Sequence, residues 1–176
     1  MKSIQDHIRS RLVSLYPRLK RFGISLTESE DSADDLVQHA CERALERSDQ
    51  WTPGTRLDSW LYSIMYHAWI DEQRSAFNKN SAPLEDALNV ESDKGTKVAE
   101  NLLMLDDVYQ ALLQLPEDQR ILLTLVCIDG MSYKEAAEIL SISIGTVMSR
   151  VSRGRFSLAK RLGQSPWQPS DIVKLR

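Results

Sequence analysis

The stretch from residue 131 to residue 161, MSYKEAAEILSISIGTVMSRVSRGRFSLAKR, constrains the possible folds more than any other part of this chain. Ser132 and Glu135 have the spacing of a capping box, in which a hydroxyl and a carboxylate bind the free amides of a helix start. A compact apolar face follows, and its alanines are small enough to let a second helix approach closely. Its members are Ala136, Ala137, Ile139 and Leu140. The pattern predicts a short helix that begins after Ser132 and packs against a neighbour.

A second helix is predicted after a turn at Ser141 and Ile142, with Ser143 as its N-cap residue. Its apolar side consists of Val147, Val151, Phe156 and Leu158. Its basic residues are Arg150, Arg153, Arg155, Lys160 and Arg161, and no acidic residue lies between Glu138 and Asp171. A short helix, a turn and a basic second helix form the helix-turn-helix layout, whose second helix enters the major groove of DNA. The alternative interpretation is a basic surface helix of an ordinary bundle, but capping, turn and charge agree on the first.

Composition supports an all-α chain. Hydrophobic residues make up 42% of the 176 residues, which is enough for folded cores, and no segment shows a strand-like alternation of useful length. The formal net charge of -3 excludes a general polyanion binder. Residues 76–106 are acidic, whereas the balance turns positive from residue 107 onward. The positive charge is therefore concentrated in the predicted helix-turn-helix.

The cysteines and histidines predict neither a metal site nor a cofactor. Cys41 and Cys127 lie in apolar helical patterns, which indicates reduced core residues, and the three histidines have no ligand-like spacing with them. No constellation of carboxylates, His or Cys has catalytic spacing, so an enzyme is not expected. The N-terminal segment is amphipathic and charged, unlike a signal peptide. Because no segment approaches the apolar length that crosses a membrane, we expect a cytoplasmic protein.

The first half predicts three helices. The first covers residues 4–22, with a kink or restart at Pro17 and a stop at Gly23. The second covers residues 29–47 and begins with a capping box of Thr27 and Glu30. Its apolar face is wide, and pattern alone assigns no partner to its polar face. That polar face consists of Asp34, Asp35, Gln38, Glu42 and Arg43.

A loop at residues 48–56 contains Trp51 and the turn pair Pro53-Gly54, and the third helix follows at residues 57–76. One side of this helix has core-like spacing, and the other carries a second stripe formed by Tyr62, Tyr66, Trp69 and Gln73. Exposed rings at such spacing can stack on splayed single-stranded bases. The alternative is that the rings pack against the first helix. Trp51 has two possible roles as well, since it either folds back on the core or stays exposed to bind a ligand.

The second half begins after a polar, acidic segment at residues 78–100, which predicts a flexible linker. Helices are predicted at residues 102–115 and from Pro116, in the N1 position, to Ile128, where Asp129-Gly130 ends the second of them. We therefore divide the chain into a first domain at 1–77, a linker at 78–100, a second domain at 101–163 and a tail at 164–176. The predicted fold is two small helical domains joined by a flexible linker.

The two halves together resemble a group IV, extracytoplasmic-function (ECF) sigma factor of bacterial RNA polymerase. The segments SADDLVQHACERAL and DSWLYSIMYHAWIDEQR are similar to the DLVQ and WL-x-x-I…D-x-x-R helices of sigma region 2. The segment LPEDQRILLTLVCIDGMSYKEAAEILSISIGTVMSRVSRGR is similar to region 4. Response regulators share the second pattern, so the pair of motifs in this order carries the resemblance. It implies a three-to-four-helix region 2 bundle and a region 4 helix-turn-helix domain.

The resemblance also implies roles for individual residues. The residues expected to bind the β′ clamp helices of core polymerase are Asp34, Asp35, Gln38 and Arg43. Those expected to read the opened −10 element of the promoter, with one base held out of the stack, are Trp51, Arg56, Tyr62, Tyr66, His67, Trp69 and Arg74. Those expected to read the −35 duplex are Thr146, Met148, Ser149, Arg150, Arg153 and Arg155.

This resemblance predicts a transcription initiation subunit that also meets the polymerase β flap and is monomeric when free. A cognate anti-sigma factor is expected to control it. The sequence departs from the common family pattern at His67, where Asn is usual, at Tyr66, where a basic residue is usual, and at Cys41 and Met148. Two alternatives remain open. A DNA-binding regulator with a receiver domain is disfavoured because the first half lacks alternating strands. A sigma-like protein that only sequesters an anti-sigma factor is compatible with the few basic residues near the predicted −10 helix.

Overall fold

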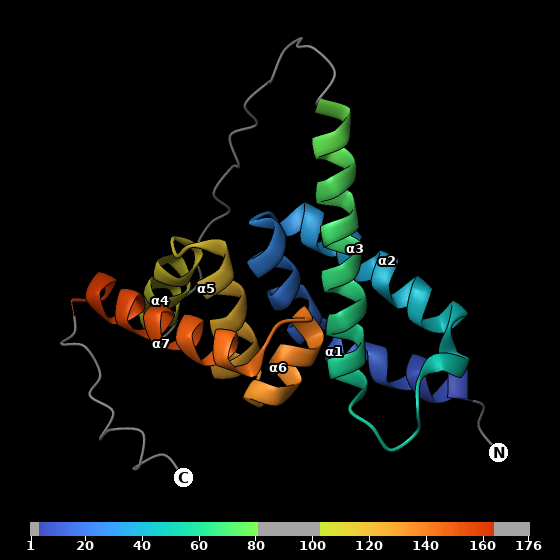
Figure 1. Cartoon of the computed structure of the whole chain (residues 1–176). Coiled ribbons are helices and arrows are strands. Elements are labelled where there is room, and N and C mark those ends of the chain that lie inside the picture. Colours follow the sequence, from blue (N-terminus) through green and yellow to red (C-terminus); the bar gives the residue numbers. More distant parts are fainter. Residues whose placement is uncertain (1–3, 81–102, 164–176) are drawn as a thin grey trace. The chain divides into compact units, whose positions relative to one another are not determined.

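The computed structural model describes residues 4–80 and 103–163, and every regular element within these ranges is a helix (Figure 1). The all-α prediction is therefore confirmed. The chain divides into two compact units, Met1–Gly95 and Thr96–Arg176. The predicted third helix continues to Asn80, and the remainder of the predicted linker, like the predicted tail, lies outside the described residues.

The first unit contains α1 (Ile4–Thr27), α2 (Glu30–Glu46), the short 3-10 helix η1 (Ser48–Gln50) and α3 (Leu57–Asn80). Each of the three long helices contacts the other two, so a single core forms between them. The largest fully buried side chains of this core are Tyr62, Phe22, Ile8, Leu19, Leu61, Met65 and Val37. Burial of these side chains is the main favourable term for such a bundle.

Helix α1 is longer than the sequence predicts, because neither Pro17 nor Gly23 ends it. Pro17 is exposed, while Leu15 and Leu19 on either side of it are buried, so packing carries the helix past the proline. Gly23 is a packing residue. A Cβ atom at this position would lie 3.0 Å from the Cβ of Ala33 in α2, which is tighter than most such contacts, so α2 would have to move by a few tenths of an ångström.

The start of α2 also differs from the prediction. Ser29 is the N-cap residue, and its hydroxyl accepts a hydrogen bond from the amide of Ser32. Thr27 instead belongs to the end of α1, where its Oγ1 donates to the carbonyl of Gly23 at 3.0 Å. The carboxylate of Glu30 forms an ion pair with Lys20 at 3.4 Å. The predicted capping box of Thr27 and Glu30 is therefore wrong.

The second unit contains α4 (Leu103–Leu113), α5 (Glu117–Leu123), a π-helical turn η2 (Thr124–Ile128), α6 (Tyr133–Leu140) and α7 (Ile144–Arg161). Pro116 occupies the N-cap position of α5, one residue earlier in the helix than predicted. Helix α7 contacts α4, α5 and α6, so three helices support it. Its Gly154 permits this approach, since a Cβ there would lie 3.1 Å from the Cγ of Leu123.

The predicted helix-turn-helix is confirmed in its local geometry. Both hydrogen bonds of the capping box are present, from the amide of Glu135 to Ser132 Oγ and from the amide of Ser132 to the Glu135 carboxylate. Ser141 ends α6 with φ 54°, and Ser143 begins α7 by accepting from the amide of Thr146 at 3.1 Å. Phe156 was predicted on the apolar side, but it is 55% exposed.

We predict that Gly23→Ala destabilises the first unit by about 1–3 kcal/mol, because overpacking forces helices apart. Unfolding in urea, followed by circular dichroism, measures this change. Gly145→Ala is the matched control, since the nearest atom to its Cβ is 3.9 Å away and alanine favours the helix. An unchanged unfolding midpoint for Gly23→Ala would show that the crossing of α1 and α2 relaxes without cost.

Candidate nucleic-acid interface

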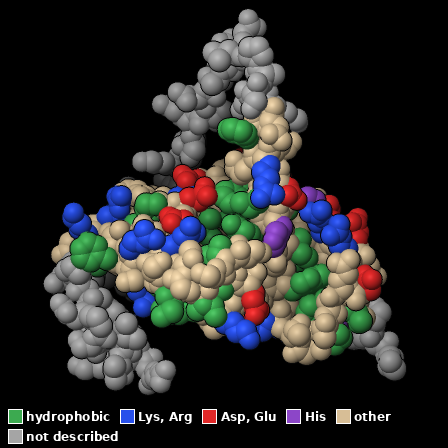
Figure 2. Space-filling view, in the orientation of Figure 1, with side chains coloured by type: hydrophobic (Ala, Val, Ile, Leu, Met, Phe, Trp, Pro, Cys, Tyr) green, Lys and Arg blue, Asp and Glu red, His purple; other side chains and the backbone are tan. Residues whose placement is uncertain are grey.

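Helix α7 presents one face to solvent, and this face carries basic, small polar and large apolar side chains. Val147, Val151 and Gly154 are buried, so the residues between them at helical spacing point outward. The exposed residues of α7 are Ile144, Gly145, Met148, Ser149, Ser152, Arg153, Phe156, Lys160 and Arg161. Lys and Arg side chains reach the surface in the space-filling view of Figure 2. This face has the shape and charge that a helix needs to enter a major groove.

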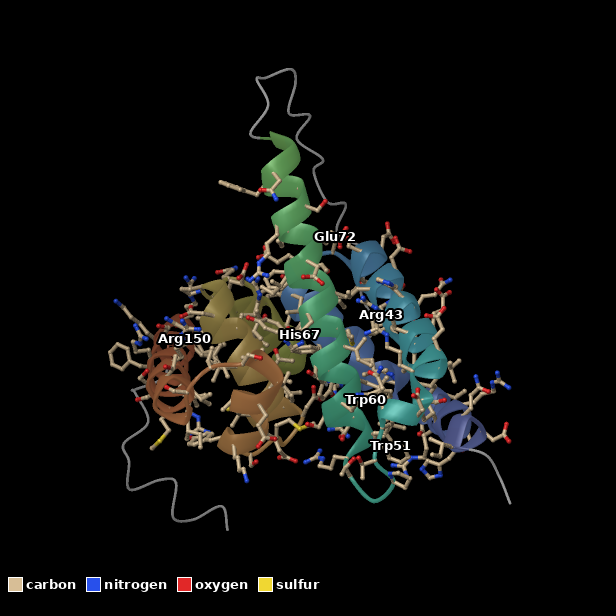
Figure 3. All side chains as sticks on the ribbon, turned by 45° about the vertical axis from the view of Figure 1, so that its right-hand side comes forward. Arg43, Trp51, Trp60, His67, Glu72 and Arg150 are labelled. Carbon is tan, nitrogen blue, oxygen red and sulfur yellow. The ribbon has the colours of Figure 1, made fainter. Side chains whose placement is uncertain are left out.

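The six residues predicted to read the −35 duplex fall into two groups. Met148, Ser149 and Arg153 are exposed. The other three, Thr146, Arg150 and Arg155, are partly buried and bond to neighbouring side chains. Arg150 forms an ion pair with Asp118 of α5 at 3.2 Å (Arg150 is labelled in Figure 3). Thr146 shares a 2.8 Å hydrogen bond with the hydroxyl of Ser143.

Arg155 lies over the side of the second unit that carries Cys127. Its Nη2 is 3.5 Å from the sulfur of Cys127. The prediction that both cysteines are core residues is wrong for Cys127, which is exposed, because the π-helical turn η2 directs it outward. Cys41 is half-buried, and burial raises the pKa of its thiol.

In the first unit, three of the aromatic rings predicted to read the −10 element are buried in the core, those of Trp51, Tyr62 and Trp69. Tyr62 is fully buried, with its ring 4.8 Å from that of Phe22 in an edge-to-face arrangement, and Trp69 is 4% exposed. The interpretation that these two rings belong to an exposed stripe is therefore wrong, and the alternative, that they pack in the core, is confirmed for them. Trp51 is 5% exposed and stacks on His7 of α1, with ring centroids 5.4 Å apart. It folds back on the core, which was one of the two outcomes considered for it.

A smaller set of predicted −10 residues reaches the surface of α3. His67 is exposed, as Figure 3 shows, and its Nδ1 lies 2.7 Å from the carbonyl oxygen of Ser63. Tyr66 is half-buried and lies between His67 and Trp69, with ring centroids 5.8 and 6.0 Å away. Arg74 is exposed further along the helix. Buried rings thus support exposed ones on the same helix.

Sequence reasoning missed a buried carboxylate at the start of α3. Asp58 is 9% exposed at its side chain and forms ion pairs with Arg18 at 3.0 Å and with Arg56 at 2.8 Å. Burial raises its pKa, but the hydrogen bonds and charge of Arg56 outweigh burial and leave the pKa below its ordinary value. The position of Asp58 could have been found from the sequence, because an acidic residue is favoured in the first turn of a helix. Arg18 lies 40 positions earlier, and nothing local predicts that pairing.

The polar face of α2 carries the residues predicted to bind core polymerase. Asp35 and Gln38 are exposed, and Gln38 donates to Glu42 at 3.0 Å. Asp34 accepts hydrogen bonds from Tyr16 Oη at 2.6 Å and Lys20 Nζ at 3.0 Å, and thus joins α2 to α1. The hydrogen bond from Tyr16, followed by that from Lys20, lowers the pKa of Asp34. Arg43 is half-buried on the same helix (Figure 3).

Among residues 4–80 and 103–163, no group of three His, Cys, Asp or Glu side chains is placed to hold a metal ion. In the same part of the chain, no helix combines the length and the apolar character needed to cross a membrane.

Comparison with known proteins identifies the class. Residues 12–78 match the family description "Sigma-70 region 2", and residues 105–158 match "Sigma-70, region 4". The chain belongs to the sigma-70 family. Sigma factors are non-enzymatic transcription initiation factors, which confirms the prediction about catalysis.

Similar proteins place the chain in the ECF group. It is 35% identical to ECF RNA polymerase sigma factor EcfG of Rhodopseudomonas palustris over 97% of this chain and 95% of that protein. It is 32% identical to SigM of Mycobacterium tuberculosis over 83% and 72%. Sigma factor RpoE of Bartonella quintana, solved with anti-sigma factor NepR, superposes with a TM-score of 0.69 at 30% identity, over 88% of this chain and 96% of that one. The chain is an ECF sigma factor, as its sequence motifs predicted.

We predict that Tyr16→Phe raises the pKa of Asp34, because the hydrogen bond from Tyr16 is the largest cause of its lowering. Since folding lowers this pKa, the stabilisation from Asp34 is complete above the ordinary carboxyl range and is lost as pH falls through the lowered value. Titration of the Asp34 carboxyl by NMR measures the shift. Tyr133→Phe, in the other unit, is the control and should leave Asp34 unchanged. An unaltered titration in Tyr16→Phe would assign the lowering to Lys20.

Proposed function

We propose that this ECF sigma factor binds core RNA polymerase, brings it to particular promoters and helps to open them. The observation that carries the proposal is the outward face of α7, where Met148, Ser149 and Arg153 are exposed on a helix that its own domain buries on the opposite side. This face reads the −35 element as duplex. Arg153 supplies donors for guanine or for phosphate, and Ser149 and Met148 contact base edges beside it.

The −10 element is read by the first unit. The loop between η1 and α3 and the exposed part of α3 receive the opened non-template strand, and one base is held out of the stack. Of the residues predicted to read this element, Arg56, His67 and Arg74 are exposed there, and Tyr66 is half-buried beside His67. Tyr62, Trp69 and Trp51 support this surface from within the core.

The polar face of α2 binds the β′ clamp helices of the polymerase. Asp35 and Gln38 make the direct contacts because both are exposed, while Asp34 is held by Tyr16 and Lys20 and fixes α2 on α1. Arg43 contributes from the edge of the same face. The second unit meets the β flap.

An anti-sigma factor controls the protein. Support comes from the Bartonella quintana sigma factor RpoE, which is 30% identical and forms a complex with anti-sigma factor NepR. Binding of such a partner and binding of core polymerase are expected to exclude each other. Competition between a NepR-type protein and core polymerase for this chain, measured by gel filtration, tests this part.

Run-off transcription with purified core polymerase on a library of promoter fragments tests the whole function. Start sites that require this protein establish initiation, and their alignment gives the −35 and −10 preferences. Core binding without initiation would favour a sequestering protein. Failure to bind core polymerase would overturn the assignment of the α2 face.

We predict that Arg150→Ala weakens binding of the −35 duplex by about 1–3 kcal/mol, whether Arg150 meets a base or orients α7 through Asp118. Core binding should remain unchanged. Fluorescence anisotropy with labelled −35 duplex, together with a core-binding assay, measures both. Lys160→Ala removes one exposed charge at the far end of α7 and is the control for charge alone. Equal loss of DNA and core binding would show that Arg150 supports the fold.

We predict that Asp35→Lys weakens core binding at least about tenfold, because it places an opposite charge at the centre of the proposed contact. Binding of the −35 duplex by the same variant should not change. Asp49→Lys introduces the same charge reversal at another exposed position and should retain core binding. Full core binding by Asp35→Lys would move the docking surface away from this face.

A further inference from the structure

The loop that connects η1 to α3 lies at the surface of the first unit. Residues 52–56 are all exposed, and the hydrogen bonds that Thr55 makes, through its amide at 3.1 Å and its hydroxyl at 2.7 Å, go to the carbonyl of Thr52 inside the loop. Trp51 anchors one end by burial, but its indole nitrogen is buried without a hydrogen-bond partner. The loop therefore depends on a polar anchor at its other end.

Asp58 is that anchor. Both of its carboxylate oxygens accept from Arg56, Oδ1 from Nε at 3.1 Å and Oδ2 from Nη2 at 2.8 Å, which is the bidentate geometry of strong charge-assisted pairs. Oδ1 also accepts from the amide of Ser59 at 2.9 Å, which fixes the carboxylate on the first turn of α3. Arg18 of α1 pairs with Oδ2 at 3.0 Å. One buried carboxylate thus joins the loop, α3 and α1.

We propose that Asp58 is a positioning residue for promoter opening: it holds Arg56 and the loop in the conformation that receives the extruded base of the −10 element. This inference rests on the proposed function. Asp58 has too little exposed surface to meet DNA itself, and it acts through Arg56. Arg18 keeps the carboxylate neutralised from the α1 side, so Arg56 is oriented without having to balance a buried charge alone.

The sign of the effect separates this role from simple electrostatics. Removing a carboxylate near DNA increases the attraction for phosphates, so charge alone predicts tighter promoter binding in Asp58→Asn. Loss of positioning predicts the opposite, because the loop then samples conformations that cannot hold the base. Asp71→Asn, an exposed carboxylate on the same helix, is the control for charge and should open promoters at least as well as the unaltered chain.

The test uses the full chain with core polymerase and a promoter that carries 2-aminopurine at the extruded position. Asp58→Asn should reduce the fluorescence rise on opening by about tenfold or more, the scale of one charge-assisted hydrogen bond. Core binding, −35 duplex binding and thermal unfolding of the same variant are measured alongside. Arg56→Gln should show the same defect, and the double variant should be no worse than either single one.

Each outcome decides the inference. Opening by Asp58→Asn at the level of the unaltered chain overturns it, and so does a parallel loss of core binding, which would make Asp58 a residue of the fold only. Additive losses in the double variant would show that Asp58 does not act through Arg56 and would also overturn it. If the unaltered chain opens no promoter, the proposed function fails first, and this inference fails with it.

Discussion

The close crossing of α1 and α2 is the constraint on which the first unit depends. Small residues of α2 recur at helical spacing on its buried side, at Ala33, Ala40 and Ala44, and Gly23 of α1 meets the first of them. Short side chains at the crossing let the two backbones approach, and the large buried side chains then fill the core between α1, α2 and α3. The same crossing leaves the opposite side of α2 free, and that side carries the polar face with Asp35 and Gln38.

The second unit uses the same solution at a different place. Gly154 brings α7 against Leu123 of α5, and the small Ala136 and Ala137 lie on the buried side of α6 beside Ile139 and Leu140. Because α7 is held from one side by several helices, its other side is rigidly presented and remains exposed. A recognition helix needs this arrangement, since a groove admits it only if the supporting helices stay out of the way.

Local signals made the second unit predictable. Capping bonds of Ser132, Glu135 and Ser143 join residues three apart, so their spacing in the sequence already specifies the helix starts. The errors came from contacts over long distances in the chain. From the sequence, Gly23 looks like a helix stop, but in the structure it is a packing residue against Ala33. The rings of α3 likewise look like an exposed stripe, but α1 and α2 cover two sides of that helix. Helical spacing shows which residues share a face, but not how many neighbours cover it.

Helix α1 connects two surfaces that serve different partners in the proposed function. Near its start, His7 stacks on Trp51 of the loop, and further along, Tyr16 and Lys20 hold Asp34 of α2, while Arg18 reaches Asp58. These contacts are spread over roughly 20 Å of one continuous helix, at the usual rise per residue. A continuous helix of this length holds the two surfaces at a fixed distance from each other. In the proposed function, the distance between the polymerase contact and the promoter strand is therefore set by one helix, which continues past Pro17 without interruption.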